Sequence, residues 1–366
     1  MNDKNILITG IGGPTPRSIA NTIRNKYPSS QVIGVDSNQE AIGFFMNGLI
    51  DKQYVAPRAD APDYWDFIHD LVEREKVDMA FVQPEAEVIE WGKYHAQHGK
   101  YPVDTFVPSL IMARTLVDKS QMSAILEGTG YIPKTVTISQ ENPKLEEIEN
   151  EIGFPCWIRA TTGSGGYGSL KIENKNNLES WLFIHKHIPD FTVSEYLPGR
   201  HLANQMLYYN GEFIKGASLE CSEYVMANVA PSGVTGNTSY GRLINEDAIL
   251  NFSHNCLQLI SGKLKTKPHG VFSFDLKEDK SGNLKVTEIN VRHMAYTGIM
   301  AEVGFDLVSD TIQLLTEPDK EIPKKGFYQY DKDYVFLRDV DTKPIITTEK
   351  EIGKMSYEKG IVNKIN

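Results

Sequence analysis

The sequence predicts an α/β and α+β protein, in which an N-terminal doubly wound parallel sheet is followed by antiparallel sheets. Two observations lead to this prediction. Over the first hundred residues, short apolar runs alternate with segments of helical periodicity, as in a parallel sheet that carries helices on both faces. Further along, residues 201–220 and 270–293 each contain two strand-like segments around a tight turn, which is typical of antiparallel hairpins.

The N-terminal sheet is predicted from a regular order of elements. The apolar run at residues 5–11 ends in glycines, as a buried parallel strand does. The pattern continues with strands at 32–36, 79–83 and 104–107 and with helices at 16–26, near 63–75 and near 86–97. Strands that alternate with helices in this way form an open parallel sheet.

The glycines after the first predicted strand suggest a nicotinamide enzyme at first sight. Gly10, Gly12 and Gly13 follow that strand, and Asp36 ends the second strand, where an acid that binds a ribose would lie. The third glycine of the G-x-G-x-x-G fingerprint is replaced by Thr15, which has a proline on each side. We therefore interpret the glycines as the tight turn of a doubly wound sheet, and an NAD(P)-dependent oxidoreductase is the less favoured alternative.

Length and composition exclude several classes of protein. A chain of 366 residues is too long for one core, so we expect two or three domains. A formal net charge of −10 argues against nucleic-acid and membrane-surface binding, and no apolar run approaches the roughly 20 residues of a membrane helix. The first residues show no apolar core followed by a small-residue cleavage site, so we do not expect secretion. The three cysteines, Cys156, Cys221 and Cys256, are too few and too far apart for a disulfide scaffold. We expect a cytoplasmic protein.

A glycine-rich segment between two predicted strands is a candidate phosphate-binding loop. The strand at 154–160 places Trp157 and Arg159 on one face, and a second strand follows at 169–172. Between them lies TTGSGGYG, with four glycines in six residues. Backbone N–H groups in such a loop can approach phosphates, although the GK[ST] of a Walker loop is missing. The alternative is a flexible hairpin without a ligand.

The hairpin at residues 270–293 brings two carboxylates together. If Ser281 and Gly282 form the loop, Asp275 and Glu288 face each other directly, with Cβ atoms about 5 Å apart. A three-residue loop would shift the register by one residue and break this pairing. Two opposed carboxylates destabilise a sheet unless a cation lies between them, and the alternative is a solvated strand face.

Further polar residues follow Glu288 on the same predicted face. Asn290 and Arg292 lie two and four residues after it. Two carboxylates and an amide oxygen are ligands that suit Mg²⁺, which retains waters and shares phosphate oxygens. The guanidinium of Arg292 offers a planar fork for a phosphoryl group. The hairpin therefore predicts a magnesium site beside a phosphate.

These motifs resemble those of the ATP-grasp superfamily. Lys119, Arg159 with its glycine loop, Glu195-Tyr-Leu197, Asp275 and Glu288-Ile-Asn290-Val-Arg292 occur in the order and spacing of that superfamily. The chain is most similar to the branch of carbamoyl-phosphate synthetases, biotin carboxylases and carboxylate–amine ligases, over roughly residues 1–315. The resemblance implies a Rossmann-like pre-ATP-grasp domain at 1–108, an ATP-grasp small lobe with a glycine-rich lid at 109–190, and a large lobe with the magnesium site at 191–320. Residues 321–366 lie beyond it, and their strand-like segments predict a strand-rich extension.

The resemblance also implies a role for each matching residue. Residues expected to bind ATP are Lys119, Arg159, Gly163, Ser164, Gly165 and Gly166 at the phosphates, Glu195 and Leu197 at adenine, and His201 at the ribose. Asp275, Glu288 and Asn290 would ligate two Mg²⁺ ions, for which Mn²⁺ could substitute. Arg292 and Asn290 would be catalytic, with Arg292 stabilising the transferred phosphoryl group. Aspartate at 275 departs from the usual glutamate or glutamine of the superfamily.

The implied activity is that of an ATP-dependent carboxylate–amine ligase. A substrate carboxylate would attack ATP to form an acyl phosphate, and an amine would then form the amide, with release of ADP and phosphate. Small molecules would be the partners, with an amino acid or a derivative as substrate, and the protein could be a homodimer. Glu85, Arg242 and His293 are the candidate substrate residues. Activation of bicarbonate, as in carbamoyl-phosphate synthetase or biotin carboxylase, is the alternative.

Overall fold

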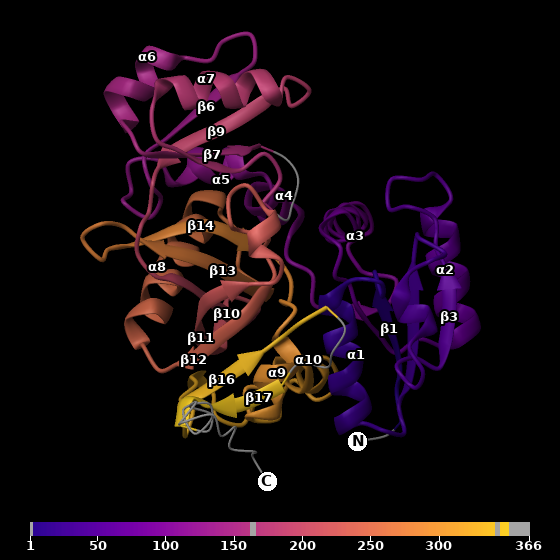
Figure 1. Ribbon diagram of the computed structural model, residues 1–366. Coiled ribbons are helices and arrows are strands. Elements are labelled where there is room, and N and C mark those ends of the chain that lie inside the picture. The colour runs from indigo at the N-terminus through magenta and orange to yellow at the C-terminus, as the bar shows by residue number, and fades with distance from the viewer. Residues whose placement is uncertain (1–2, 162–165, 341–344, 351–366) are drawn as a thin grey trace, which may run out of the picture.

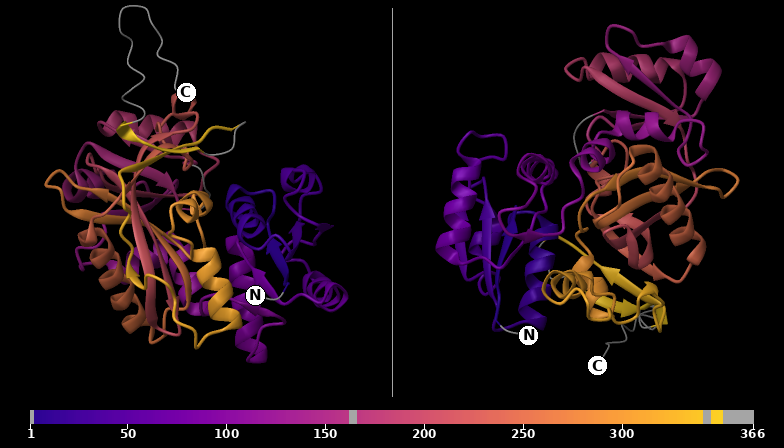
Figure 2. Two further views of the ribbon diagram at one scale, coloured as in Figure 1. Left: turned by 90° about the horizontal axis from the view of Figure 1, so that it is seen from below. Right: turned by 180° about the vertical axis from the view of Figure 1, so that it is seen from behind.

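Three sheets organise the chain in the computed structural model, which describes residues 3–161, 166–340 and 345–350 (Figure 1). A five-stranded parallel sheet comes first, and a four-stranded antiparallel sheet and a larger, mainly antiparallel sheet follow. The predicted fold class is therefore confirmed. Figure 2 shows the N-terminal domain beside the large sheet, while the four-stranded sheet lies at one end of the large sheet.

The N-terminal sheet has five parallel strands in the order β3-β2-β1-β4-β5. Its strands are β1 (Asn5–Thr9), β2 (Gln31–Asp36), β3 (Lys52–Val55), β4 (Met79–Phe81) and β5 (Asp104–Thr105). Its helices are α1 (Pro14–Lys26), the 3₁₀ turn η1 (Ile42–Phe45), α2 (Tyr64–Glu75) and α3 (Glu85–His98). The sequence pattern missed only the short edge strand β3, whose side chains are half-exposed and carry no apolar run.

Side chains on the two faces of β1 explain why helices cover both sides. Ile6 and Ile8 pack with Ile19 of α1, whereas Leu7 packs with Trp91 of α3 on the opposite face. Successive strand residues point to opposite faces, so a continuous apolar run needs a layer of helices on each side. The sheet is therefore doubly wound, as predicted.

Two helices, α4 (Leu110–Val117) and α5 (Lys119–Leu126), lead into the four-stranded sheet. This sheet has the order β6-β9-β7-β8 and is antiparallel throughout. Its strands are β6 (Thr135–Ser139), β7 (Cys156–Ala160), β8 (Leu170–Ile172) and β9 (Asp190–Glu195). Its covering turns and helix are α6 (Leu145–Glu147), the π-helical turn η2 (Ile148–Ile152) and α7 (Lys175–Ile184).

The large sheet has the order β14-β13-β10-β11-β12-β16-β17, and β15 pairs with β11. Its strands are β10 (His201–Tyr209), β11 (Glu212–Tyr224), β12 (Thr238–Ile244), β13 (Gly270–Glu278), β14 (Leu284–Asn290), β15 (Gly326–Phe327), β16 (Tyr334–Leu337) and β17 (Ile345–Thr348). Its helices are the 3₁₀ turn η3 (Ala227–Val229), α8 (Asp247–Leu264), α9 (Thr297–Glu302) and α10 (Leu307–Thr316).

The predicted hairpin between β10 and β11 is confirmed, with Tyr209 opposite Glu212 across a two-residue loop. Both loop residues, Asn210 and Gly211, have positive φ angles, of 50° and 96°. A two-residue turn of this kind matches the twist of the flanking strands, and asparagine and glycine adopt such angles at the lowest cost.

Helix α10 lies between the large sheet and the N-terminal domain. Its Leu307 and Leu314 belong to the core of the large sheet, whereas Val308 and Ile312 pack with Ile8 and the other buried residues beside β1. Helix α9 also contacts α1. Two helices from the second half of the chain thus hold the N-terminal domain against the large sheet. The predicted domain boundaries stay predictions.

We expect Gly298→Val to destabilise the contact between α1 and α9. A Cβ atom at Gly298 would lie 2.8 Å from the Ser18 hydroxyl oxygen and 3.1 Å from the Ser18 carbonyl oxygen, and the Gly298 N–H donates to that hydroxyl. Overpacking of this kind costs about 1–3 kcal/mol of unfolding free energy, measurable by urea denaturation. Gly262→Ala in α8, where a Cβ would meet nothing within 4 Å, should instead stabilise by up to about 1 kcal/mol. An unchanged midpoint for Gly298→Val would contradict this account.

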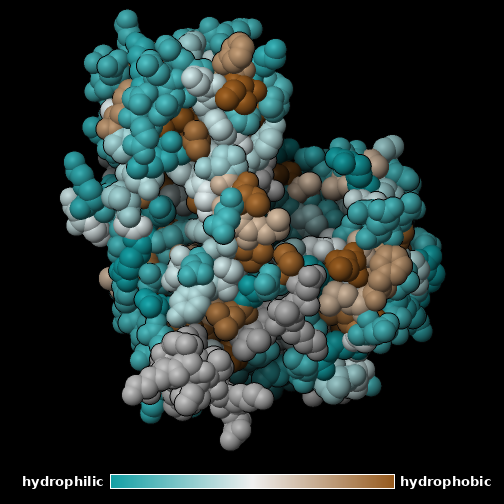
Figure 3. All heavy atoms as spheres, viewed as in Figure 1, coloured by the Kyte–Doolittle hydropathy of each residue, from teal (hydrophilic) through white to brown (hydrophobic). Residues whose placement is uncertain are grey.

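The surface in Figure 3 is mainly hydrophilic, and hydrophobic side chains gather around the hollow between the N-terminal domain and the rest of the molecule. Within the described residues, no helix is both long and apolar enough to cross a membrane.

Candidate functional site

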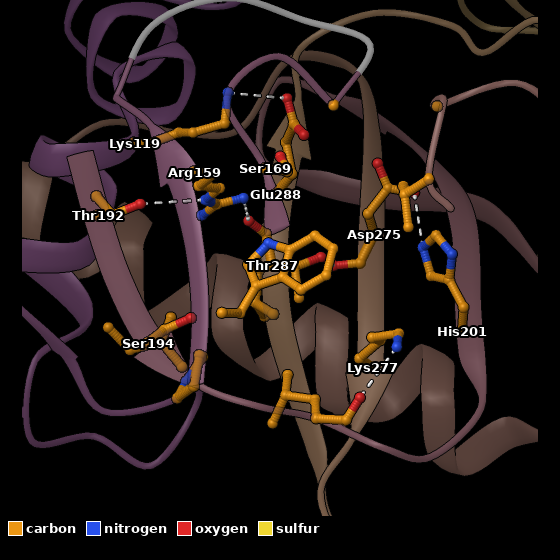
Figure 4. A pocket seen from close by; sticks show the side chains of 18 of the residues that line it. Lys119, Arg159, Ser169, Thr192, Ser194, His201, Asp275, Lys277, Thr287 and Glu288 are labelled. Atoms are coloured by element: carbon orange, nitrogen blue, oxygen red, sulfur yellow. Dashed lines mark hydrogen bonds and ion pairs between the residues drawn. The ribbon is translucent and has the colours of Figure 1, made fainter. Parts of the chain in front are cut away.

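A cavity of about 240 Å³ lies between the four-stranded sheet and the large sheet. Strands β7 and β9 form one wall, and β10, β13 and β14 form the other (Figure 4). The predicted site residues that line it are Lys119, Arg159, Gly166, Glu195, Leu197, His201, Asp275 and Glu288. Residues that are up to 169 positions apart in the sequence (119 to 288) therefore meet at one place.

Asp275 and Glu288 face each other across β13 and β14, as the hairpin predicted. The predicted two-residue loop is wrong, because the last pair of the hairpin is Glu278 with Leu284, and five residues connect them. A β-bulge at Thr287 then shifts the register by one and restores the pairing of the carboxylates. The longer loop and the bulge compensate each other.

The bulge also supplies a hydrogen-bond acceptor for Arg159. Arg159 Nη1 donates to the Thr287 carbonyl oxygen at 3.1 Å, and Nε donates to the Thr192 hydroxyl at 3.3 Å. Burial lowers the pKa of the Arg159 guanidinium, while Glu288 and Asp275 oppose this shift. These two hydrogen bonds hold the Arg159 guanidinium in the cavity wall, and among the described residues it forms no direct ion pair.

Lys119 approaches the carboxylate pair from α5. Its Nζ lies 3.5 Å from Glu288 Oε1, and Asp118 caps the helix, because its carboxylate accepts from the backbone N–H groups of Ser120 and Gln121. The Glu288 side chain is 37% exposed within the cavity, yet the surrounding protein desolvates it and raises its pKa, with Lys119 opposing and Asp275 adding to the shift.

Asn290 and Arg292 continue from Glu288 toward the N-terminal domain. Asn290 Nδ2 donates to Asp275 Oδ2 at 3.4 Å, so its side chain reaches the carboxylate pair from a buried position. Arg292 lies just past the end of β14, and its Nη2 forms an ion pair of 3.4 Å with Glu85 Oε1 at the start of α3. A candidate substrate residue is thereby brought next to a candidate catalytic residue.

The residues expected at adenine and ribose also line the cavity. Glu195 Oε2 accepts from the Lys134 backbone N–H at 3.0 Å, and the side chain of Leu197 is buried. His201 Nε2 lies 3.7 Å from Asp275 Oδ1. The roles predicted for these residues stay predictions.

Part of the predicted glycine loop, Gly163, Ser164 and Gly165, lies outside the described residues. Gly166 is described and has a φ angle of +79°, and a Cβ there would lie 2.3 Å from the Val234 carbonyl oxygen. Positive φ and this close approach both require glycine. The described end of the glycine loop thus packs on the loop between β11 and β12.

None of the three candidate substrate residues lines the cavity, and neither do Asn290 and Arg292. Glu85 pairs with Arg292, and the other two lie as follows. Arg242 points toward acidic partners, with Nε 2.5 Å from Glu349 Oε1 and Nη1 4.0 Å from Glu220 Oε2. His293 is buried, and desolvation together with the charge of Arg292 lowers its pKa to about 3, so it is neutral at physiological pH. Both assignments stay predictions without a contact to the cavity.

The glycine turn of the N-terminal sheet already has its acid engaged. Asp36 Oδ2 accepts from the Gly12 N–H at 2.9 Å, and Oδ1 accepts from the Asn38 N–H at 2.9 Å. This arrangement supports the interpretation of a structural turn rather than a ribose site.

Three further residues at or behind the cavity wall were missed by the sequence analysis. Lys277 follows Asp275 by two residues, so strand alternation could have identified it; its Nζ donates to the Leu197 carbonyl oxygen at 3.0 Å, and burial lowers its pKa. Tyr224 pairs with His201. Arg338 follows β16, is largely buried beside Tyr296, and pairs with no carboxylate among the described residues. No local signal marks the last two.

The donor set at the carboxylate pair fits Mg²⁺. Asp275, Glu288 and Asn290 offer three oxygen-bearing side chains within one hairpin, and repulsion between the two carboxylates would be relieved by a divalent cation. The described residues contain no cluster of three His, Cys, Asp or Glu side chains that would form a complete protein cage. Such a partial set suits a metal ion that also binds phosphate oxygens and water.

Comparison with known proteins identifies the fold. No protein-family model matches the chain, and no curated protein matches its sequence. Among solved structures, N5-carboxyaminoimidazole synthetase from Staphylococcus aureus, complexed with ADP, matches with a TM-score of 0.70 and 15% identity over 91% of this chain and 82% of that chain. L-amino acid ligase from Bacillus licheniformis matches with a TM-score of 0.66 and 11% identity over 92% of this chain and 80% of that chain.

A third solved structure is the biotin carboxylase domain of 2-oxoglutarate carboxylase from Hydrogenobacter thermophilus. It matches with a TM-score of 0.65 and 14% identity over 92% of this chain and 75% of that chain. All three are ATP-grasp enzymes, and this chain has the ATP-grasp fold. The fold expected from the five sequence motifs is confirmed.

Proposed function

We propose that this protein is an ATP-dependent carboxylate–amine ligase that releases ADP and phosphate. The observation that carries the proposal is the cavity between the two sheets, where the Asp275–Glu288 pair meets Lys119 and Arg159. The S. aureus and H. thermophilus structures with the same fold were solved with ADP. A nucleoside triphosphate needs cations and metal ligands near its phosphates and an apolar surface with hydrogen-bonding groups near its base. The residues that line the cavity include candidates for each of these.

The phosphates would lie beside Lys119 and Arg159, and adenine would lie near Leu197. The buried side chain of Leu197 supplies an apolar wall, and Glu195 stands at the end of the neighbouring strand. Lys119 and Arg159 would balance the negative charge of the phosphates. The phosphates would in turn give the desolvated Arg159 guanidinium an anionic partner. We also propose that the predicted glycine loop, which includes Gly166, covers the phosphates.

Asp275, Glu288 and Asn290 would hold Mg²⁺, with Mn²⁺ as a substitute. The metal would neutralise charge on the phosphates when it is bound. Lys119, at 3.5 Å from Glu288, keeps one carboxylate of the pair oriented toward the phosphate side of the cavity. Two ions, as the resemblance implies, would engage both carboxylates.

The reaction proceeds in two displacements. A carboxylate oxygen of the substrate attacks the γ-phosphorus, the bond from that phosphorus to the bridging oxygen breaks, and ADP leaves. The amine then attacks the carbonyl carbon of the acyl phosphate, the carbon–oxygen bond to phosphate breaks, and the amine loses a proton. Lys119, Arg159 and Arg292 stabilise the negative charge that is transferred, so positioning and electrostatics supply the catalysis. No covalent enzyme intermediate is needed.

The substrates would bind where the hairpin meets the N-terminal domain. Arg292 and the half-buried Arg338 offer positive charge for a carboxylate, and Glu85 offers negative charge for an amine. An amino acid or a small derivative carries both groups. Bicarbonate is the second candidate for the carboxylate, because the H. thermophilus structure with this fold was solved with bicarbonate.

We propose a cytoplasmic location and a homodimer. All three cysteines are buried free thiols, which suits a reducing compartment. The H. thermophilus structure is described as a dimer.

An ADP-release assay tests the proposed function. The purified chain is incubated with Mg²⁺-ATP and with a panel of amino acids, singly and in pairs, and with bicarbonate combined with each amine. Release of ADP that requires both a carboxylate and an amine, with amide formed in equal amount, would support the ligase. Release that needs bicarbonate would favour the second candidate. Absence of ADP binding by isothermal titration calorimetry would contradict both.

A further inference from the structure

Tyr224, His201 and Asp275 form a continuous polar contact along one wall of the cavity. Tyr224 ends β11, His201 begins β10, and Asp275 lies on β13, so three neighbouring strands of the large sheet contribute one residue each. The Tyr224 hydroxyl is hydrogen-bonded to His201 Nδ1, and His201 Nε2 lies 3.7 Å from Asp275 Oδ1. Figure 4 shows His201 and Asp275 on the side of the cavity away from Lys119.

The direction of the Tyr224 hydrogen bond decides which nitrogen of His201 carries the proton. If the Tyr224 hydroxyl donates to Nδ1, the neutral ring carries its proton on Nε2, and that N–H faces the Asp275 carboxylate. If Nδ1 donated instead, the lone pair of Nε2 would face a carboxylate oxygen, which is repulsive. The donating arrangement is therefore favoured, and Tyr224 selects the tautomer that attracts Asp275.

Both oxygens of Asp275 then have a defined neighbour. Oδ2 accepts from Asn290 Nδ2 at 3.4 Å, and Oδ1 faces His201 Nε2. Glu288 lies opposite on the neighbouring strand and repels Asp275, so a carboxylate without these neighbours would turn away from the pair. A metal site needs its ligands held in place before the ion arrives, and residues behind the ligands usually do this.

Tyr224 also stands at the base of the loop that borders the cavity mouth. The Val225 N–H donates to the Asn237 carbonyl oxygen at 2.7 Å, and the Thr235 hydroxyl donates to the Val225 carbonyl oxygen at 2.7 Å, which closes residues 225–237 into one loop. Val234 in this loop is the residue whose carbonyl oxygen approaches Gly166. The hydroxyl of Tyr224 thus links the loop to the carboxylate pair.

We propose that Tyr224 is a positioning residue of the metal site, which acts through the tautomer of His201 to orient Asp275. The inference rests on the proposed function, in which Asp275 binds Mg²⁺. It assigns His201 to Asp275 rather than to the ribose of ATP, because both ring nitrogens are directed at protein partners. Tyr224 is not among the candidate residues named from the sequence.

The test is calorimetric titration of Tyr224→Phe with ADP over a series of Mg²⁺ concentrations. Removal of the hydroxyl keeps the ring and frees the tautomer, so we expect about tenfold weaker apparent Mg²⁺ affinity of the ADP complex, as for other residues behind metal ligands. Affinity for ADP without Mg²⁺ should stay unchanged. Tyr334→Phe, which removes an exposed hydroxyl bonded to Asp331, is the matched control and should behave as the wild type.

His201→Gln provides a second variant with the same expected Mg²⁺ defect, and the double variant should show no further loss, because both residues act on one contact. A folded Tyr224→Phe with the Mg²⁺ dependence of the wild type overturns the inference. So does a His201→Gln variant that weakens ADP binding equally with and without Mg²⁺, since this would indicate a ribose contact. A wild-type chain that binds no ADP overturns the proposed function itself, and the inference with it.

Discussion

On the proposed function, Glu288→Gln should abolish ADP release, with a loss of at least about 100-fold in kcat, because a neutral amide in place of the carboxylate would weaken a proposed direct metal ligand and not only its surroundings. The structure gives the reason. Glu288 faces Asp275 directly and lies 3.5 Å from Lys119, so its charge contributes to both the metal site and the orientation of the lysine. The measurement is steady-state ADP release at saturating ATP and substrates.

The matched control is Glu212→Gln. Glu212 is an exposed glutamate paired with Lys325, far from the cavity lining, and its loss should leave ADP release unchanged. The amide in Glu288→Gln also relieves repulsion with Asp275, so the variant should be at least as stable as the wild type. Full activity of Glu288→Gln with an intact Mg²⁺ dependence would refute the metal assignment.

Lys215→Met should cause a large loss of stability at a position away from the cavity. Lys215 Nζ lies 2.6 Å from Asp310 Oδ2, and the side chains are only 3% and 7% exposed. The substitution leaves a buried carboxylate without its cation, which typically costs about 3–5 kcal/mol. The pair joins β11 to α10, so the contact with the N-terminal domain should weaken as well. Urea denaturation of Lys325→Met, an exposed lysine of the same kind, is the control.

The loss in Lys215→Met should grow as the pH rises. Burial raises the pKa of Asp310 to about 6, with Lys215 opposing the shift and Asp306 adding to it. The pKa of this carboxyl is about 3.9 in the unfolded chain and higher in the folded state. The folded protein therefore loses stability as the pH rises from the unfolded to the folded pKa. Without Lys215 the folded pKa rises further and the window extends upward, so the variant should be closer to the wild type at pH 5 than at pH 8. An equal difference at both values would contradict this explanation.

The hairpin shows how far local pattern can lead. Alternation along 270–293 correctly placed Asp275 opposite Glu288, although the loop behind that prediction was wrong. The connection between the strands has five residues, and the extra residue Thr287 on β14 corrects the register. A bulge cannot be read from alternation, because the bulged residue continues the same chain without a distinct composition. Only the tertiary structure shows what the bulge contacts: the Thr287 carbonyl oxygen accepts a hydrogen bond from Arg159.

Other parts of the site had no local signal at all. Tyr224 and Arg338 reach the cavity region through strand neighbours and through packing, and nothing in their flanking residues distinguishes them from other strand residues. Arg242 shows the opposite case, since it was predicted as a substrate residue, while in the structure its side chain pairs with Glu349.

The sequence by itself determined the elements and their order, namely the doubly wound N-terminal sheet, the hairpin at Asn210-Gly211 and the motifs of the ATP-grasp fold. The sheet and the hairpin follow from the period of apolar residues and from turn chemistry, both of which act over a few neighbouring residues, whereas the motifs rest on the resemblance to the ATP-grasp superfamily. Only the tertiary structure decided that α10 packs on both the large sheet and the N-terminal domain, and that Lys119 meets Glu288. Such contacts depend on the burial of side chains from distant segments, and a local pattern does not encode which surface a segment will meet.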